Sequence, residues 1–151
     1  MSKLSNWAET AILKLLLQNL DWANIGDAGG LLGSVADGNF YVALHTADPG
    51  EAGSQVTSEI AYTGYARVAI TRDIAGFLVA DNNGTNVDTV LFPKMTGGAG
   101  GTATWLTIGQ NASGASEYIV RYEISDPVGG ILVAVGNTPE VGAENLDINI
   151  D

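Results

Sequence analysis

The sequence contains no cysteine and only one histidine, His45. Without cysteine, the chain can form no disulfide, no thiolate metal site and no thiol nucleophile. With one histidine, it cannot build a multi-histidine metal site within a single subunit. These absences leave no reason to expect a bound cofactor.

Basic residues are also scarce, because six Lys and Arg stand against 17 Asp and Glu, for a formal charge of −11. Affinity for nucleic acid comes mainly from Lys and Arg, and the six are scattered, so we expect no nucleic-acid partner. No apolar run reaches the roughly 18 residues that a membrane span requires. The longest N-terminal run, residues 11–17, is interrupted by Lys14 and lacks a small-residue cleavage site. We therefore expect a soluble protein with no membrane partner and no signal peptide.

The length of 151 residues predicts a single domain over residues 1–151, with an N-terminal helix within residues 1–22 and a β-sandwich over residues 38–151. The helix itself is expected at residues 3–20, which contain no Gly or Pro and are rich in Leu and Ala. Asn6 and Glu9 have the spacing of an N-terminal capping pair, and Ser2 is a competing start.

This helix is expected to be apolar over most of its circumference, because its polar side chains fall on one narrow stripe. A helix of this kind requires cover on more than one side. The sequence leaves two alternatives for what covers the helix. The segment at residues 22–35 can fold back over the helix, or a second subunit or another protein can dock on it. The docking residues would be Leu13, Leu16, Leu17 and Leu20.

After Gly38 the pattern changes to short alternating runs rich in Val, Ile, Thr and Tyr and separated by turn residues, which is typical of β-strands. Seven strands are expected, at residues 40–45, 65–71, 86–92, 102–108, 117–124, 131–135 and 146–150. Because no helical crossover lies between them, we expect an antiparallel β-sandwich of jelly-roll type. The longest connection, residues 47–64, is expected to cross an end of the sandwich or to reach a neighbouring subunit.

His45 lies at the end of the first expected strand, where it could act as an acid or base with Asp48 as its orienting partner. No nucleophile motif accompanies it. A hydrogen bond from the imidazole to the backbone of the following loop would fix the strand exit equally well, and we favour this structural interpretation.

The segment at residues 81–88 is rich in oxygen ligands, and Asp81, Asn83 and Asp88 are weak candidates for calcium ligands. The segment matches no complete calcium-loop pattern. Asn83-Gly84 between two apolar runs is typical of a hairpin turn, and we favour the hairpin over a metal site.

Three tryptophans, Trp7, Trp22 and Trp105, could anchor an interface or offer a platform to a sugar ring, although packing within the fold is the default interpretation. After Arg121 there are six acids and no base, so this part of the chain either docks on a basic partner or forms a solvated face.

Residues 40–53, with the sequence FYVALHTADPGEAG, resemble the most characteristic motif of a family of small bacteriophage virion proteins. The resemblance continues through Glu59, residues 64–67 and residues 86–93, and it ends at residues 136–139. Members of this family also begin with an amphipathic helix, so the resemblance covers most of the chain. Residues 97–122 depart from the family pattern.

The resemblance implies a phage structural component, called either a tail fibre protein or a capsid decoration (cement) protein, with a β-sandwich and no enzymatic activity. The chain has none of the repeats, long coiled coils or collagen-like tracts that build an elongated fibre, which favours decoration. We therefore expect a cement protein that binds the outer surface of the major capsid protein lattice and stabilises the head. A tail or tail-fibre component, with host carbohydrate as a candidate ligand, is the alternative.

Within this interpretation, the connection at residues 47–64 contacts a neighbouring subunit through Asp48, Pro49 and Glu51, and the helix contributes to self-association. The protein is expected to be made in the cytoplasm of the bacterial host and to act on the capsid surface of the virion. Its expected partners are the major capsid protein and further copies of itself, with a trimer favoured over a dimer.

Overall fold

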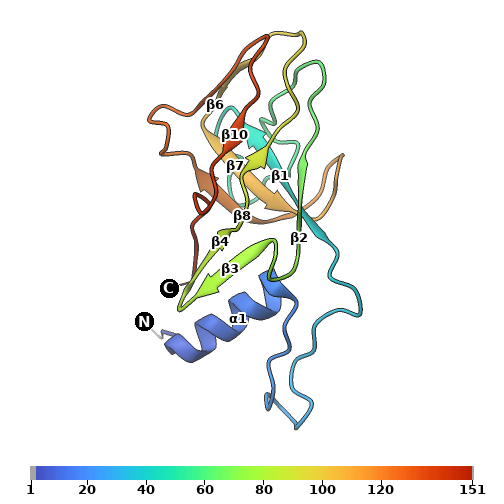
Figure 1. The fold of residues 1–151 in the computed structure, drawn as a ribbon, viewed down its shortest axis with the longest axis vertical. Coiled ribbons are helices and arrows are strands. Elements are labelled where there is room, and N and C mark those ends of the chain that lie inside the picture. Colours follow the sequence, from blue (N-terminus) through green and yellow to red (C-terminus); the bar gives the residue numbers. More distant parts are fainter. Residues whose placement is uncertain (1–2, 151) are drawn as a thin grey trace. The chain divides into compact units, whose positions relative to one another are not determined.

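The structure is a computed structural model that describes residues 3–150. Within these residues it contains one helix and eleven strands, and six of the strand pairs are antiparallel (Figure 1). The mainly β, antiparallel fold with one N-terminal helix is therefore confirmed. Within residues 3–150, no helix is long and apolar enough to cross a membrane.

The helix is α1 (Asn6–Gln18), and the strands are β1 (Asn39–His45), β2 (Val68–Thr71), β3 (Phe77–Ala80), β4 (Asn83–Asn86), β5 (Val90–Leu91), β6 (Gly101–Ala103), β7 (Trp105–Gly109), β8 (Tyr118–Glu123), β9 (Ile131–Val133), β10 (Glu140–Val141) and β11 (Ile148–Asn149).

The chain divides into two compact units, each assembled from separate stretches of sequence. The helical unit comprises residues 3–39, 70–88 and 143–150 of the described chain and contains α1, β3, β4 and β11. The β unit comprises residues 40–69 and 89–142 and contains the other strands, apart from the first residue of β1 and the last two of β2. The expectation of a single domain over residues 1–151 stays a prediction.

In the helical unit, α1 packs against the hairpin of β3 and β4, and β11 pairs with the other edge of β4. The helix begins later than expected because Ser5 caps it, accepting a hydrogen bond from the backbone N–H of Ala8. Asn6 is the first helical residue, and the other predicted start, Ser2, lies outside the described residues. Arg72 donates to the carbonyls of Leu15 and Leu16, which satisfies backbone acceptors near the end of the helix.

The inner face of α1 is covered mainly by this hairpin, which the sequence analysis did not predict. Leu13 and Leu17 are 0% and 1% exposed. Gly84 of β4 makes room for them, because a Cβ at this position would lie 2.4 Å from Cδ1 of Leu17. The segment after the helix also touches it, through an edge-to-face contact of Trp22 with Trp7.

The sequence analysis missed β3 and β4 because the alternation there is short and is followed by polar residues. The predicted strand at residues 86–92 is wrong as a continuous element, since β4 ends at Asn86 and β5 covers only Val90–Leu91. The hairpin at this point is confirmed, but its turn is Asp81-Asn82, and Asn83 and Gly84 already belong to β4.

The β unit is organised around β1 and β7, which pair in register from Tyr41↔Gly109 to His45↔Trp105. The sheet order is β2-β1-β7-β8, and two shorter pairs, β5 with β10 and β6 with β9, complete the unit. The central strands are buried on both faces, since Ala43 and Leu44 of β1 are both 0% exposed. The strands are distributed over several small sheets, and the jelly-roll order stays a prediction.

Candidate functional site

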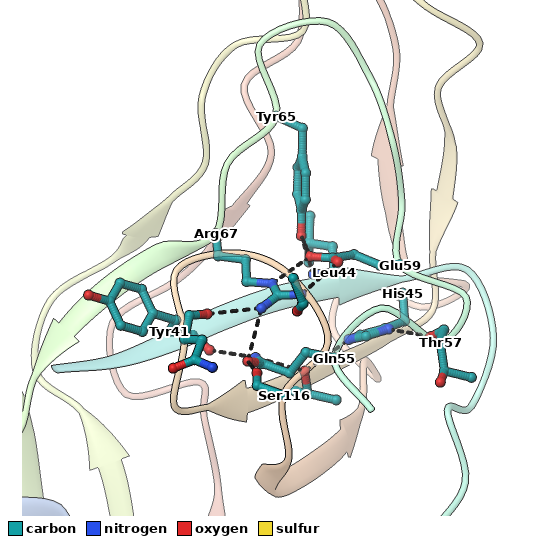
Figure 2. Close-up of polar contacts among 12 residues, drawn as sticks. Tyr41, Leu44, His45, Gln55, Thr57, Glu59, Tyr65, Arg67 and Ser116 are labelled. Carbon is teal, nitrogen blue, oxygen red and sulfur yellow. Dashed lines mark hydrogen bonds and ion pairs between the residues drawn. The ribbon is translucent and has the colours of Figure 1, made fainter. Parts of the chain in front are cut away.

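The β unit holds a buried polar cluster under the connection that follows β1, residues 46–64, which we call the β1 loop (Figure 2). The loop turns back along the strand that precedes it. Ile60 donates its backbone N–H to the carbonyl of Leu44 at 2.8 Å, and an antiparallel bridge joins Glu59 to His45. The base of the loop is thereby fixed on its own sheet, with its polar side chains buried.

His45 ends β1 and is 0% exposed. Its Nδ1 lies 2.8 Å from the carbonyl oxygen of Thr57 in the β1 loop, and its Nε2 lies 2.9 Å from the hydroxyl oxygen of Thr107 on β7. A carbonyl can only accept, so Nδ1 carries the proton and Nε2 accepts from the Thr107 hydroxyl. The predicted hydrogen bond from the imidazole to the loop backbone is confirmed.

The environment of His45 favours the neutral imidazole. Burial lowers the pKa of His45, and the hydrogen bond to Thr57 opposes that effect only in part. Both ring nitrogens are engaged within the fold, and Asp48 pairs elsewhere, so the imidazole has no free nitrogen for acid or base chemistry.

Arg67 and Glu59 form the centre of the cluster. Nε and Nη2 of Arg67 donate to the two carboxylate oxygens of Glu59 at 2.7 and 2.8 Å, an ion pair with two parallel hydrogen bonds. The side chains are 2% and 15% exposed, respectively. The hydrogen bond that Arg67 donates to the carboxylate of Glu59 raises the pKa of Arg67 above its ordinary value.

The other guanidinium protons of Arg67 reach a second loop. Nη1 donates to the carbonyl of Asn111 at 2.9 Å and to Oε1 of Gln55 at 3.2 Å, and Nη2 donates to the carbonyl of Gly114 at 2.9 Å. With the two bonds to Glu59, all five N–H donors of the guanidinium are used. Arg67 therefore joins the β1 loop to residues 111–114 through its planar guanidinium group.

Gln55 completes the cluster and is fully buried. Its amide nitrogen donates to the carbonyl of Tyr41 at 2.9 Å, and its amide oxygen accepts from Arg67 and from the hydroxyl of Ser116. Gly109 of β7 makes room for it, because a Cβ there would lie 2.1 Å from Cδ of Gln55. A glycine is required at position 109 because the side chain of Gln55 packs where a Cβ would lie.

Tyr65 closes the cluster on the side of β1. Its hydroxyl donates to Oε1 of Glu59 at 2.9 Å and accepts from the backbone N–H of Leu44 at 3.1 Å. Burial raises the pKa of Tyr65, so the phenol stays protonated. The cluster is thus an internal set of mutually satisfied polar groups, and what it does chemically is to hold the β1 loop rigid.

The tip of the β1 loop lies over β7 and β8 and remains accessible. Arg121 of β8 donates to both oxygens of Asp48 at 2.7 Å, and it lies over the ring of Trp105 at 5.8 Å from the centroid. The hydrogen bond from Arg121 lowers the pKa of Asp48. The hydroxyl of Tyr118 donates to the carbonyl of Gly50, which fixes the tip to β8.

The structure separates the predicted contact residues into exposed and buried ones. At the loop tip, the side chains of Asp48 and Glu51 are 40% and 92% exposed, whereas Pro49 is buried and offers no surface to a partner. In α1, Leu13 and Leu17 are core residues, and this part of the predicted docking face is wrong. Leu20 is 43% exposed and Leu16 is half-buried, and their role in docking stays a prediction.

The candidate calcium ligands are used by the fold in other ways. Asn83 donates its amide to a carboxylate oxygen of Asp147 at 2.7 Å, and Asp81 accepts from the hydroxyl of Thr10 through its backbone carbonyl. Asp88 accepts from the amide of Asn86, also through its backbone. Among the described residues, no group of three or more His, Cys, Asp or Glu side chains is arranged to hold a metal ion.

The sequence analysis did not single out Gln55 or the pairing of Glu59 with Arg67. One signal for this pairing was present in the sequence. Of only six Lys and Arg in the chain, Arg67 stands inside a β-strand pattern, between apolar residues. A buried arginine requires an anionic partner, and Glu59 is the acid nearest to it in the preceding loop.

The model of the family described as Podophage GP4 fiber I protein gp80 matches residues 3–127, which include α1, the β1 loop and the whole polar cluster. No curated protein matches the sequence.

Proposed function

The chain belongs to the phage virion protein family described as podophage GP4 fiber I protein gp80, and we propose that it is a structural component of a phage tail fibre. The observation that carries the proposal is the match to this family over most of the chain. The expected assignment to a phage structural family is confirmed, whereas the position in the virion is part of the proposal.

The ordered structure of the β1 loop supports a role in binding a neighbouring subunit. A fibre subunit must present a contact surface that does not rearrange when it is pulled, and ordering a loop in advance removes part of the entropy lost on binding. The cluster around Arg67 provides this order below the loop, and the contacts of Asp48 with Arg121 provide it at the tip. We propose that the exposed acids at the tip contact a basic surface on a neighbouring virion subunit.

The proposal includes the absence of catalysis. Three buried polar side chains of the β unit, His45, Gln55 and Arg67, have their hydrogen-bonding atoms engaged with neighbouring side chains and with the backbone. Such groups have no free atom to offer to a substrate.

Capsid decoration is the second candidate. It is favoured by the absence of fibre-forming repeats in a chain of 151 residues. On a capsid lattice, the same exposed loop tip would bridge major capsid subunits, and many weak contacts would sum to a large stabilisation.

Counting the protein in purified virions separates the two candidates. We would measure its copies relative to the major capsid protein by quantitative mass spectrometry of purified particles. A fibre component is expected at a small number of copies that matches the symmetry of the tail. A ratio near one, or a simple fraction set by the symmetry of the capsid lattice, would show capsid decoration and not a fibre component. Absence from the particle would exclude both functions.

Charge reversal at the loop tip tests the contact itself. Glu51→Lys is expected to reduce incorporation into virions, because the side chain is 92% exposed and its loss leaves the polar cluster intact. The matched control is Glu140→Lys, which makes the same change of charge at an exposed position on β10 of the same unit. Equal incorporation of the two variants, measured by mass spectrometry, would remove the loop tip from the contact.

A further inference from the structure

The helical unit contains an open pocket of about 600 Å³ that the proposed structural role does not use. Its walls are the outer face of α1, the segment at residues 20–24 and the turn between β3 and β4. All three walls belong to the same unit, and Thr10 joins two of them, because its hydroxyl lies 2.6 Å from the carbonyl oxygen of Asp81.

Two indole rings lie among the apolar residues that line the pocket. Trp7 is 64% exposed, and its ring lies 5.3 Å from that of Trp22 at an interplanar angle of 73°. Trp22 is held by paired backbone hydrogen bonds with Leu31, at 2.8 and 2.9 Å. The exposed ring of Trp7, set against that of Trp22, offers an apolar platform that a ligand can cover.

The indole N–H of Trp22 is not part of the pocket surface. It is buried and has no hydrogen-bond partner within residues 3–150, so Trp22 contributes its ring and not its donor to the pocket.

Polar side chains surround the indoles. Asp21, Asp81, Lys14, Asn6 and Asn24 are among the residues that line the pocket. Asp21 uses one carboxylate oxygen to accept from the backbone N–H of Gly33, which fixes its orientation. The pocket thus combines an aromatic platform with carboxylate and amide groups.

From this combination we propose that the pocket of the helical unit binds a saccharide that is neutral or carries an amino group. The C–H face of a pyranose ring packs on an indole, and its hydroxyls are satisfied by carboxylate and amide side chains. Two carboxylates against one ammonium group disfavour an anionic sugar, as does the charge of −11 of the whole chain. The site lies apart from the β1 loop in sequence and adds a ligand to the proposed virion role without depending on it.

The test measures saccharide binding by the full chain. We would titrate it with glucosamine, N-acetylglucosamine, galactose and glucuronate and follow saturation-transfer NMR and the tryptophan fluorescence. Binding of at least one of the first three, at millimolar concentration and in preference to glucuronate, is the expected result. Binding of none of them overturns the proposal, and preference for glucuronate overturns the assignment of charge.

Matched variants locate the site. Trp7→Ala is expected to weaken binding at least about tenfold, because it removes the stacking platform. Leu32→Ala is the control, since Leu32 is exposed to a similar degree, 68%, in the same unit but does not line the pocket. Equal affinity of the two variants would overturn the assignment of the pocket, provided that both keep the far-UV circular dichroism of the unmodified chain.

A charge variant tests the chemical class. Asp81 has φ of +53°, a conformation that asparagine also tolerates, so Asp81→Asn removes the charge without added backbone strain. It is expected to weaken the binding of glucosamine by a larger factor than that of N-acetylglucosamine. An equal effect on both sugars would show that no carboxylate at this position recognises an amino group.

A protein partner is the competing occupant of the pocket. A photo-crosslinking amino acid at position 7 that captures a phage virion protein would overturn the saccharide assignment. The copy number of the protein in virions would be unchanged by that result, so failure of this inference is distinguishable from failure of the proposed function.

Discussion

Replacing Arg67 is expected to destabilise the β unit more than any surface substitution. Arg67→Ala removes five hydrogen bonds and leaves the carboxylate of Glu59, which is 15% exposed, without a cation. Breaking a buried ion pair from one side costs about 3–5 kcal/mol. Because water can reach Glu59 in part, we expect a loss near the middle of this range, about 4 kcal/mol. For a chain of this size, that corresponds to a fall in Tm of roughly 8–16 °C.

Arg67→Lys separates charge from geometry. The lysine keeps a positive charge near Glu59 but offers three donors in place of five, so at least two of the carbonyl and amide partners lose their hydrogen bonds. At about 1 kcal/mol for each lost bond, the expected loss is about 2 kcal/mol. A lysine variant as stable as the unmodified chain would show that charge alone, and not the five-donor arrangement, holds the cluster.

The assay is urea unfolding followed by the fluorescence of Trp105, which lies in the β unit. The background variant carries Trp7→Phe and Trp22→Phe, so that the helical unit does not contribute to the signal. Arg121→Ala is the matched control, because its ion pair with Asp48 is partly exposed, with side chains 29% and 40% accessible, and is expected to contribute less to stability than a buried pair. A loss below about 1 kcal/mol for Arg67→Ala, or a loss equal to that of the control, would refute the reasoning.

Three further predictions concern burial and packing. Burial lowers the pKa of His45 in the folded state, so the contribution of His45 to stability is fully present above the unfolded pKa of about 6.5 and is lost as the pH falls below that value. His45→Gln is expected to lack this part of the pH dependence, measured as urea midpoints across a pH series. Gly109→Ala places a Cβ against Gln55 and is expected to destabilise the chain by about 1–3 kcal/mol in urea unfolding. Leu13→Ala is expected to lower the stability by about 2–5 kcal/mol, and Leu20→Ala by much less, because Leu13 lies in the core and Leu20 at the surface. Equal losses of stability in thermal unfolding would contradict these placements.

The strand pattern of the β unit was largely predictable because alternation is a local property. Residues 40–45 alternate in the sequence and form most of β1, and the strands expected at residues 117–124 and 131–135 contain β8 and β9. The strand expected at residues 102–108 is wrong as a continuous element, since it is divided at Thr104 between β6, which pairs with β9, and β7, which pairs with β1 and β8. The role of His45 was also predictable, since a histidine at the end of a buried strand needs partners nearby. In each case the relevant neighbours are close along the chain or on the adjoining strand.

The hairpin of β3 and β4 was not predictable in the same way. Its second strand, Asn83–Asn86, has the sequence NGTN, which carries no apolar alternation. The alternating burial of this strand arises because α1 packs against the hairpin and Leu17 occupies the space beside Gly84. The segment that covers the helix could therefore be identified only from the tertiary structure, in which distant parts of the chain lie together.

The sequence by itself determined the properties that depend on composition and on near neighbours along the chain. These are the acidic charge, the absence of thiol chemistry, the helix at the N-terminus and the antiparallel β class, because each follows from residue type or from a periodicity of two or 3.6 residues. The motif at residues 40–53 indicated the phage virion family for the same reason, since it is a continuous string of residues.

Only the tertiary structure decided which polar groups meet. Arg67 donates to the carbonyls of Asn111 and Gly114, which lie 44 and 47 residues away in the sequence, and no local pattern encodes that contact. Which of the three tryptophans would line a pocket was equally open, because the exposure of Trp7 depends on how the helix packs and on where residues 20–24 pass. Long-range packing sets the surroundings of a side chain, and these surroundings decide whether it serves as core, as support or as a binding surface.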